Sequence, residues 1–230
     1  MILCNKLPSC NQAFIGRKDE IKAIASHLSN QSVLFITGMA GIGKSEVAKA
    51  YAQKNRKKYT NIIYLYYTGN LRKDIANLTF ADDSVEMNEE VRFQNHYKVM
   101  QRLHTDTLLI LDNFNVLPKD EPFLKELMKN DMQLLITSRC KLKNYDSIEI
   151  KELDKDKELK ELFYKHCPSA KRDPDSVSAI IEEVNCHTLT VCMAALTLEV
   201  SGMEPEELLQ KLRSCGIGQN TEEIEVFKDE

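Results

Sequence analysis

The feature that most constrains this chain is a glycine-rich stretch of eight residues, Gly38-Met39-Ala40-Gly41-Ile42-Gly43-Lys44-Ser45. It fits the phosphate-loop pattern G-x-x-x-x-G-K-[ST] at every fixed position. Its three glycines allow backbone conformations closed to residues with a Cβ, so successive N–H groups can curl around an anion at the start of a helix. In such a loop Lys44 is expected to reach the β- and γ-phosphates of a nucleotide and Ser45 to bind Mg²⁺.

The segments on either side of the loop supply the context that the pattern requires. Residues 33–37 are β-branched and aromatic, which is typical of a buried strand, and residues 46–52 are typical of a helix. A strand, a loop and a helix therefore follow one another, as in phosphate-binding loops. The alternative is a glycine-rich turn that carries an incidental Lys-Ser pair.

A second apolar run, within residues 106–114, ends in an acid. Four apolar residues precede Asp112, and the carboxyl end of a parallel strand lies beside the phosphate loop in this class of fold. We therefore predict that Asp112 helps to hold Mg²⁺, whereas the alternative is a turn residue that starts a loop. The next residue, Asn113, is a neutral amide that cannot take a proton at pH 7.

Two arginines are further candidates. Arg139 follows the apolar run at residues 132–138, where a guanidinium could reach a terminal phosphate with paired donors. Arg17 stands at the start of an amphipathic helix and could lie near a nucleotide base. On spacing alone, each arginine could equally be a solvated surface charge.

The remaining pattern predicts an α/β domain followed by a helical one. Further strands are expected at residues 61–67 and 146–150, and helices at residues 71–78, 84–104 and 120–130, which gives a five-stranded parallel sheet. Four helices follow, at residues 154–166, 174–185, 187–201 and 205–215. The expected organisation is a lead-in segment at 1–13, a phosphate-loop domain at 14–150, a helical lid at 151–216 and an acidic, truncated tail at 217–230.

Composition excludes several other classes of protein. The net charge of −4, from 31 basic and 35 acidic residues, gives no bulk attraction to nucleic acid or acidic membranes, so neither partner is indicated. No apolar run approaches the roughly 18 residues of a membrane span, and no signal peptide is visible, which predicts a cytoplasmic protein. The seven cysteines are scattered without metal-ligand spacing and are expected to be reduced.

Taken together, these motifs resemble the signal-transduction NTPases of the NB-ARC/STAND class, which are related to AAA+ proteins. Phe14-Ile15-Gly16-Arg17 is similar to the family's hydrophobic-hydrophobic-Gly-Arg motif, and Ile136-Thr137-Ser138-Arg139 to the motif at the end of its fourth strand. The resemblance implies that Phe14, Ile15 and Arg17 contact adenine and that Arg139 senses the γ-phosphate. With these we assign to nucleotide binding the whole loop, from Gly38 to Ser45, the adjacent Glu46, and Leu189.

Three departures from the family pattern accompany the resemblance. Residues 185–190 stand where the family has a G-L-P element, with Leu189 near the place of the proline that packs against adenine. Asn113 replaces the second acid found in many ATP-hydrolysing relatives. The chain also stops about where the family's winged-helix domain would begin, so we expect a nucleotide-binding fragment of a larger protein.

The expected function is an ATP/ADP-dependent switch with slow, Mg²⁺-dependent hydrolysis, in which Lys44, Asp112 and Arg139 are the catalytic residues and Ser45 and Asp112 hold the metal. The adenine nucleotide is expected between the two domains, and the full-length protein is expected to self-associate in its ATP state. The rivals are an AAA+-type motor or loader, a small-molecule kinase, and a nucleotide-locked scaffold that never hydrolyses.

Overall fold

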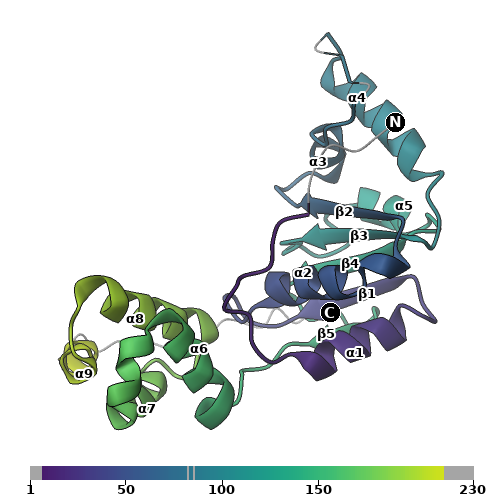
Figure 1. Cartoon of the computed structure of the whole chain (residues 1–230). Helices are drawn as coiled ribbons and strands as arrows, with labels where there is room; N and C mark the ends of the chain where they lie inside the picture. Colours follow the sequence, from purple (N-terminus) through teal and green to yellow (C-terminus); the bar gives the residue numbers. More distant parts are fainter. Residues whose placement is uncertain (1–6, 82, 85, 215–230) are drawn as a thin grey trace. The chain divides into compact units, whose positions relative to one another are not determined.

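The chain divides into two compact units after Lys151 in a computed structural model (Figure 1). The structure describes residues 7–81, 83–84 and 86–214. The start of the predicted lead-in segment and the predicted acidic tail therefore lie outside the described residues. Each unit is considered by itself below.

The first unit is built on a five-stranded sheet with the strand order β2-β3-β4-β1-β5, in which all neighbouring strands are parallel. This confirms the predicted five-stranded parallel sheet. Its strands are β1 (Val33–Thr37), β2 (Asn61–Tyr66), β3 (Thr107–Asp112), β4 (Gln133–Ser138) and β5 (Ser147–Glu149).

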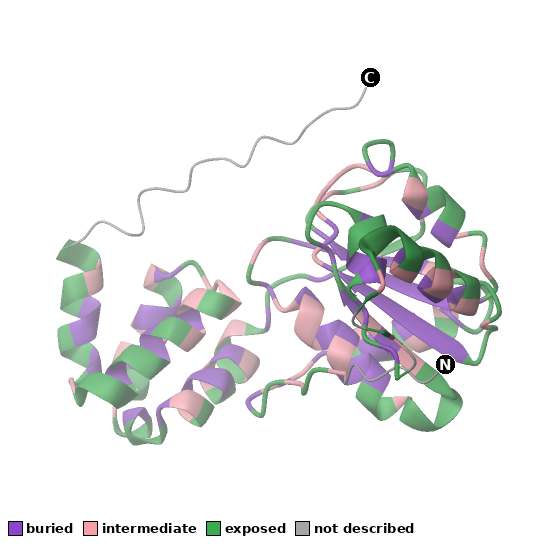
Figure 2. Ribbon diagram, turned by 90° about the horizontal axis from the view of Figure 1, so that it is seen from above, coloured by how far each residue is buried: buried purple, intermediate pink, exposed green. Residues whose placement is uncertain are grey.

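The central strands consist of nearly continuous apolar residues because helices cover both faces of the sheet. Successive side chains of a strand point to opposite faces, so Leu34 and Ile36 of β1 lie in one core and Phe35 lies in the other. All six residues of β3 and of β4 are buried. Figure 2 shows this buried sheet between helices that expose their outer sides.

The helices of the first unit form the two outer layers. The core beneath α1 and α2 contains Ile24 and Val47, whereas the opposite core contains Leu71, Phe93 and Leu124 from α3, α4 and α5 (Figure 1). In chain order the elements are α1 (Lys18–His27), α2 (Lys44–Lys54), the 3-10 turn η1 (Arg56–Lys58), α3 (Leu71–Ala76), α4 (Glu89–Met100) and α5 (Phe123–Leu127).

Two of these helices are shorter at both ends than the sequence pattern predicts, and α3 ends at Ala76 rather than at residue 78. The prediction of a helix over residues 84–104 is wrong at both ends, because α4 spans Glu89–Met100. The residue before it, Asn88, caps the helix, because its side chain accepts a hydrogen bond from Val91 N–H. Likewise the helix predicted at residues 120–130 is reduced to α5. In both cases the apolar spacing continued past the last helical residue into a turn, at residues 101–102 after α4 and 128–129 after α5.

The second unit is entirely helical. The segment predicted as one helix at residues 154–166 is a π-helical turn followed by an α-helix, and the other three predicted helices are present. Its core includes Phe163, Ile180 and Leu198. The elements are η2 (Lys155–Leu159), α6 (Lys160–His166), the 3-10 turn η3 (Pro168–Arg172), α7 (Pro174–Glu183), α8 (Thr188–Ser201) and α9 (Pro205–Ser214).

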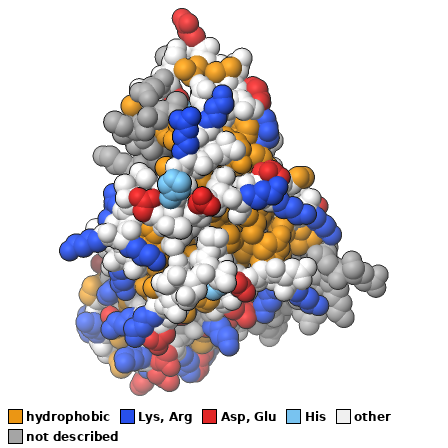
Figure 3. Space-filling model, turned by 90° about the vertical axis from the view of Figure 1, so that its right-hand side faces the viewer, with side chains coloured by type: hydrophobic (Ala, Val, Ile, Leu, Met, Phe, Trp, Pro, Cys, Tyr) orange, Lys and Arg blue, Asp and Glu red, His pale blue; other side chains and the backbone are white. Residues whose placement is uncertain are grey.

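Two surface properties bear on possible partners. None of the helices within the described residues is long and apolar enough to cross a bilayer. On the face drawn in Figure 3, lysine and arginine side chains lie among aspartate and glutamate side chains and apolar patches. That distribution agrees with the small net charge of the chain, −4.

Candidate functional site

The glycine-rich loop lies at the carboxyl end of β1, where the topology brings several polar strand ends together. Because all strands are parallel, the ends of β1, β3 and β4 meet at one edge of the sheet. From β1 the chain passes through the loop and α2 to β2, at the far side of the sheet from β5. Such a reversal of strand order is where open α/β sheets form their binding crevice.

The backbone of the loop requires glycine at defined positions. Gly38 has φ of 145° and Gly43 has φ of 103°, both closed to ordinary L-residues. A Cβ on Gly38 would lie 2.7 Å from the Ile150 carbonyl oxygen, whereas a Cβ on Gly43 would meet nothing within 4 Å. Glycine is therefore required at position 38 because two chain segments approach closely there, and at position 43 because the backbone turns into α2.

Lys44 is held inside the loop that precedes it. Its Nζ donates hydrogen bonds to the carbonyl oxygens of Gly38, at 2.8 Å, and Met39, at 2.7 Å, and only 9% of the residue is exposed. Burial lowers the pKa of Lys44 from 10.5 to about 8, with a further lowering from the charge of Arg139 and an opposing effect from Asp112. An anion bound beside Lys44 would stabilise its charged form.

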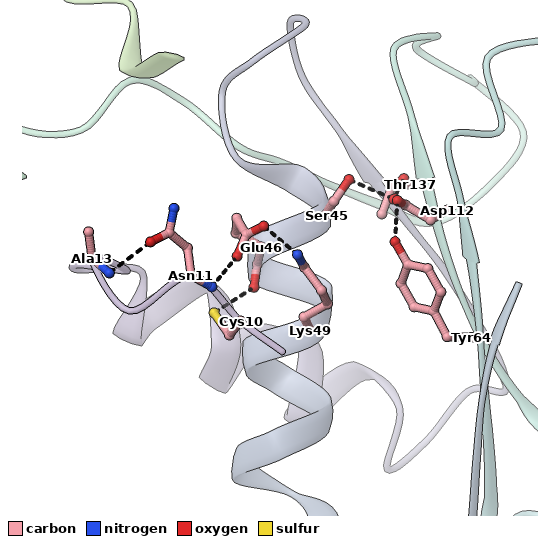
Figure 4. A network of polar contacts seen from close by, with 9 residues as sticks. All are labelled: Cys10, Asn11, Ala13, Ser45, Glu46, Lys49, Tyr64, Asp112 and Thr137. Carbon is pink, nitrogen blue, oxygen red and sulfur yellow. Dashed lines mark hydrogen bonds and ion pairs between the residues drawn. The ribbon is translucent and has the colours of Figure 1, made fainter. Parts of the chain in front are cut away.

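Asp112, at the end of β3, accepts three hydroxyl groups. Ser45 donates to Oδ1 at 2.7 Å, Thr137 donates to the same oxygen at 2.5 Å, and Tyr64 donates to Oδ2 at 2.5 Å (Figure 4). These distances are those of charge-assisted bonds to a carboxylate. Asp112 is 3% exposed, so the loop, β2, β3 and β4 all converge on one buried carboxylate.

A cavity of about 250 Å³ opens between the loop and the strand ends. Lys44 lines it from the start of α2, and Arg139 lines it from the segment after β4. Within the described residues the guanidinium of Arg139 has no carboxylate within ion-pairing distance. Two cations thus border one cavity, and the lining residues are Ala40, Gly41, Gly43, Lys44, Ser45, Glu46, Asn113, Asn115, Thr137 and Arg139.

Two asparagines line the cavity after β3. Asn113 has a left-handed backbone, with φ of 66°, and its N–H donates to Thr137 Oγ1 at 2.9 Å. Its side-chain oxygen accepts from Asn115 Nδ2 at 2.5 Å, and Asn115 Oδ1 accepts from the N–H of Arg139 at 2.9 Å. This chain of amides fixes Asn113 at the cavity and ties it to the backbone of Arg139.

Arg17 is buried, with 6% of the residue exposed, and its guanidinium is engaged by protein oxygens. It donates to the carbonyls of Lys151, at 2.7 Å, and Ile42, at 3.2 Å, and it forms an ion pair with Glu20. Gly16 and Arg17 also both have left-handed backbones, with φ of 65° and 59°. Arg17 therefore joins the loop to the segment after β5, while Ile15 is buried and Phe14 packs partly buried against the α1/α2 core.

Glu46 connects the loop helix to the segment before residue 14. Its carboxylate accepts from the N–H of Asn11 at 2.7 Å and forms an ion pair with Lys49, and its carbonyl accepts from the Cys10 thiol (Figure 4). Burial, followed by the negative charge of Glu46, raises the pKa of Cys10 to about 11. Glu46 thus lines the cavity and also anchors the incoming chain.

The last assigned residue, Leu189, lies elsewhere in the chain. It belongs to the first turn of α8 in the second unit and is 50% exposed. Of the assigned residues, part of the loop, Glu46 and Arg139 line the cavity. Asp112 is bonded to two lining residues, Ser45 and Thr137, and Arg17 donates to the loop carbonyl of Ile42.

The donor set around Asp112 fits a hard cation such as Mg²⁺, which prefers oxygen ligands. The hydroxyl of Ser45 donates its hydrogen bond to Asp112, which leaves the oxygen lone pairs of Ser45 able to bind a metal. Within the described residues there is no cluster of three or more His, Cys, Asp or Glu side chains that could hold a metal alone. That suits Mg²⁺, which usually takes one or two protein carboxylates together with substrate phosphates.

Sequence reasoning missed three residues of this site. Thr137 and Asn115 line the cavity, and Tyr64 bonds the carboxylate of Asp112. Tyr64 and Asp112 could have been placed on the same face of the sheet, because the even-numbered residues of β2 and β3 share one face. That inference requires the register of the two strands, which the sequence does not give. Asn115 follows β3 in a loop, where no periodicity fixes a side chain.

Comparison with solved structures identifies the architecture. A Walker-type ATPase of Pyrococcus abyssi matches 91% of this chain and 74% of its own length, with a TM-score of 0.65 and 10% identity. The chain has the P-loop NTPase fold. Neither the comparison with protein-family models nor the comparison with curated proteins gives a match.

Two other solved structures share this P-loop fold. A point variant of RuvB from Thermotoga maritima matches with a TM-score of 0.55 and 14% identity, over 93% of this chain and 75% of that one. A STAND protein with a tetratricopeptide-repeat sensor from Pyrococcus horikoshii matches with a TM-score of 0.50 and 16% identity. That match covers 91% of this chain and 33% of the STAND protein. At these identities the likeness concerns the fold alone.

Proposed function

We propose that this chain is the adenine-nucleotide-binding part of a STAND-type regulatory protein and acts as a slowly hydrolysing ATP/ADP switch. The observation that carries this is the cavity bordered by Lys44 and Arg139, with a buried carboxylate, Asp112, bonded to the loop hydroxyl of Ser45. Two cations that border one cavity favour a polyphosphate ligand. The loop glycines and the start of α2 add backbone donors, because the first N–H groups of a helix lack partners within it.

The metal would be held by Ser45 and Asp112. When bound with a nucleotide, Mg²⁺ neutralises the charge that develops on the phosphates. The residues of the chain have separate roles: Lys44 binds the phosphates, Thr137 keeps Asp112 in place, and Arg139 faces the end of the phosphate chain. Adenine specificity is supported by the resemblance of residues 14–17 to an adenine-binding motif.

The switch depends on a contact that differs between ATP and ADP. Only ATP offers Arg139 a terminal phosphate, and a ligand shifts a conformational equilibrium only through such differential contacts. Arg139→Ala is therefore expected to weaken ATP binding about tenfold, equivalent to about 1.4 kcal/mol, while ADP affinity changes by less than about twofold. Isothermal titration with each nucleotide measures both values.

The matched control for Arg139 is Lys141→Ala, which removes another positive charge two residues away. Lys141 pairs with Glu149 at 2.7 Å and does not line the cavity, so its loss should weaken both nucleotides equally and only slightly. Equal losses of ATP and ADP affinity in Arg139→Ala would contradict a γ-phosphate contact.

Slow hydrolysis follows from Asn113. It occupies the cavity next to Asp112, and its amide cannot accept a proton from an attacking water. Asn113→Asp is expected to keep nucleotide affinity and to raise the rate of ATP hydrolysis tenfold or more, since a positioned base contributes about 10²–10⁴-fold. Aspartate tolerates the left-handed backbone and can still accept the bond from Asn115.

Asn115→Asp tests whether charge alone explains such an increase. It introduces the same negative charge into the cavity but at the residue whose side chain holds Asn113 and the Arg139 backbone. Because a carboxylate in place of the Asn115 amide cannot donate to Asn113, phosphate release should stay the same or fall in this control, and a rise would attribute the increase to charge alone. An unchanged rate in Asn113→Asp would show that the missing acid is not what limits hydrolysis.

A second candidate is a constitutive ATPase motor, and the fold that the chain shares with a solved Walker-type ATPase supports ATP turnover. Steady-state turnover of the unmodified chain separates the two, since a rate above about 1 s⁻¹ belongs to ordinary enzymes rather than to slow switches. Binding of ATP with no detectable turnover would instead indicate a nucleotide-locked scaffold.

A further inference from the structure

One hydroxyl at the site comes from a strand that phosphate-loop motifs do not include. Tyr64 belongs to β2, and its phenol donates to Asp112 Oδ2, while Ser45 and Thr137 both donate to Oδ1 (Figure 4). An ionised carboxylate only accepts, so all three hydroxyls are donors. The two oxygens of Asp112 are therefore unequal: Oδ1 faces the loop and β4, and Oδ2 is occupied from β2.

The register of the sheet explains how Tyr64 reaches this carboxylate. In the parallel pair β2–β3, Tyr64 lies opposite Ile110, and Asp112 is two residues further along the same face of β3. Two residues of strand span about 6.6 Å, which the long side chain of tyrosine bridges toward the strand end. Burial, and then the bond to Asp112, raise the pKa of Tyr64 well above its ordinary value.

Holding the two strands together does not require this bond. Backbone pairing joins β2 and β3 over their whole length, from Asn61 opposite Thr107 to Tyr66 opposite Asp112. The phenol instead meets a carboxylate that is already bonded to the loop. Such outer hydrogen bonds fix the orientation and basicity of a metal-binding group and are typically worth about 10–100-fold in metal affinity.

We propose that Tyr64 is a positioning residue for the metal-binding carboxylate, and that its hydroxyl sets the Mg²⁺ concentration that tight nucleotide binding requires. By holding Oδ2, it keeps Oδ1 of Asp112 directed at Ser45. This role rests on the proposed nucleotide function. It adds Tyr64 to the residues on which Mg²⁺ binding depends.

The test is Tyr64→Phe, which keeps the ring and removes only the hydroxyl. ATP binding is measured by isothermal titration over a series of Mg²⁺ concentrations and in EDTA. We expect the Mg²⁺ concentration at which ATP affinity shows half of its full increase to rise about tenfold. The affinity for ATP in EDTA should change by less than about twofold. Tyr66→Phe is the matched control, because Tyr66 lies on the same strand with its side chain exposed, and its Mg²⁺ requirement should equal that of the unmodified chain.

Asp112→Asn separates an effect through the carboxylate from a general loss of structure. In that background Tyr64→Phe should add no further change in Mg²⁺ requirement, as expected for residues that act as one unit. An unaltered Mg²⁺ requirement in Tyr64→Phe, or equal losses of affinity with Mg²⁺ and in EDTA, would overturn the role of Tyr64 alone. Failure of the unmodified chain to bind ATP at all would overturn the proposed function, and this inference with it.

Discussion

Lys44→Ala is expected to reduce the affinity of the chain for both ATP and ADP at least a hundredfold, equivalent to about 2.7 kcal/mol. The side chain is buried in the loop and borders the cavity, so its charge lies where the phosphates are proposed to bind. Bonds to a charged group contribute about 1.5–3 kcal/mol each, and Lys44 would serve more than one phosphate. Fluorescence competition or isothermal titration measures the change.

The matched control is Lys49→Ala on the same helix. Lys49 lies further along α2 and pairs with Glu46, so its loss removes the same charge without removing a cavity-lining cation. Affinity in this variant should stay within about threefold of the unmodified value. Thermal unfolding without ligand checks that Lys44→Ala has kept its fold. Retained ATP affinity in a folded Lys44→Ala protein would overturn the site assignment.

Gly38→Ala is expected to destabilise the first unit by about 3 kcal/mol. The substitution imposes two costs, because φ of 145° is strained for alanine and the new Cβ would lie 2.7 Å from the Ile150 carbonyl oxygen. Backbone strain of this kind costs about 1–3 kcal/mol, and overpacking against a backbone adds about 1–3 kcal/mol. Calorimetry or denaturant unfolding measures the loss of stability. Denaturant unfolding is monitored by circular dichroism, because the chain has no tryptophan.

Gly43→Ala isolates the strain from the clash. Gly43 also has a positive φ, of 103°, but a Cβ there would meet nothing within 4 Å. Its replacement should therefore cost about 1–2 kcal/mol, clearly less than that of Gly38. Equal losses in the two variants would show that the approach to Ile150 does not matter to the stability of the loop.

The sheet and the edge that carries the candidate site could be predicted from sequence, because local patterns determine the strands. Residues 33–37 were expected to be a strand and are β1, and the strand that ends at Asp112 is β3. Parallel strands place their carboxyl ends at one edge, so Asp112 and the loop had to be neighbours. Helix ends were harder to predict from sequence. At the start of α4, Asn88 caps the helix although the apolar spacing in the sequence continues beyond it.

Side-chain contacts between distant segments could not be predicted in the same way. Arg17 could be assigned to a base contact or to the surface, yet its guanidinium donates to the carbonyls of Ile42 and Lys151. Tyr64 and Asn115 depend on strand register and on loop conformation, which no local pattern encodes. The order of the motifs thus predicted the candidate site, whereas the side-chain contacts within it depend on three-dimensional packing.

The most direct test is to identify the nucleotide that the purified, unmodified chain carries or binds. Denaturing the protein and separating what is released should yield ADP or ATP. Titration with Mg²⁺ present should show binding of both adenine nucleotides and weaker binding of GTP. A protein that carries no nucleotide and has no measurable affinity for ATP or ADP would contradict the proposal that residues 38–45 and Asp112 form an adenine-nucleotide site.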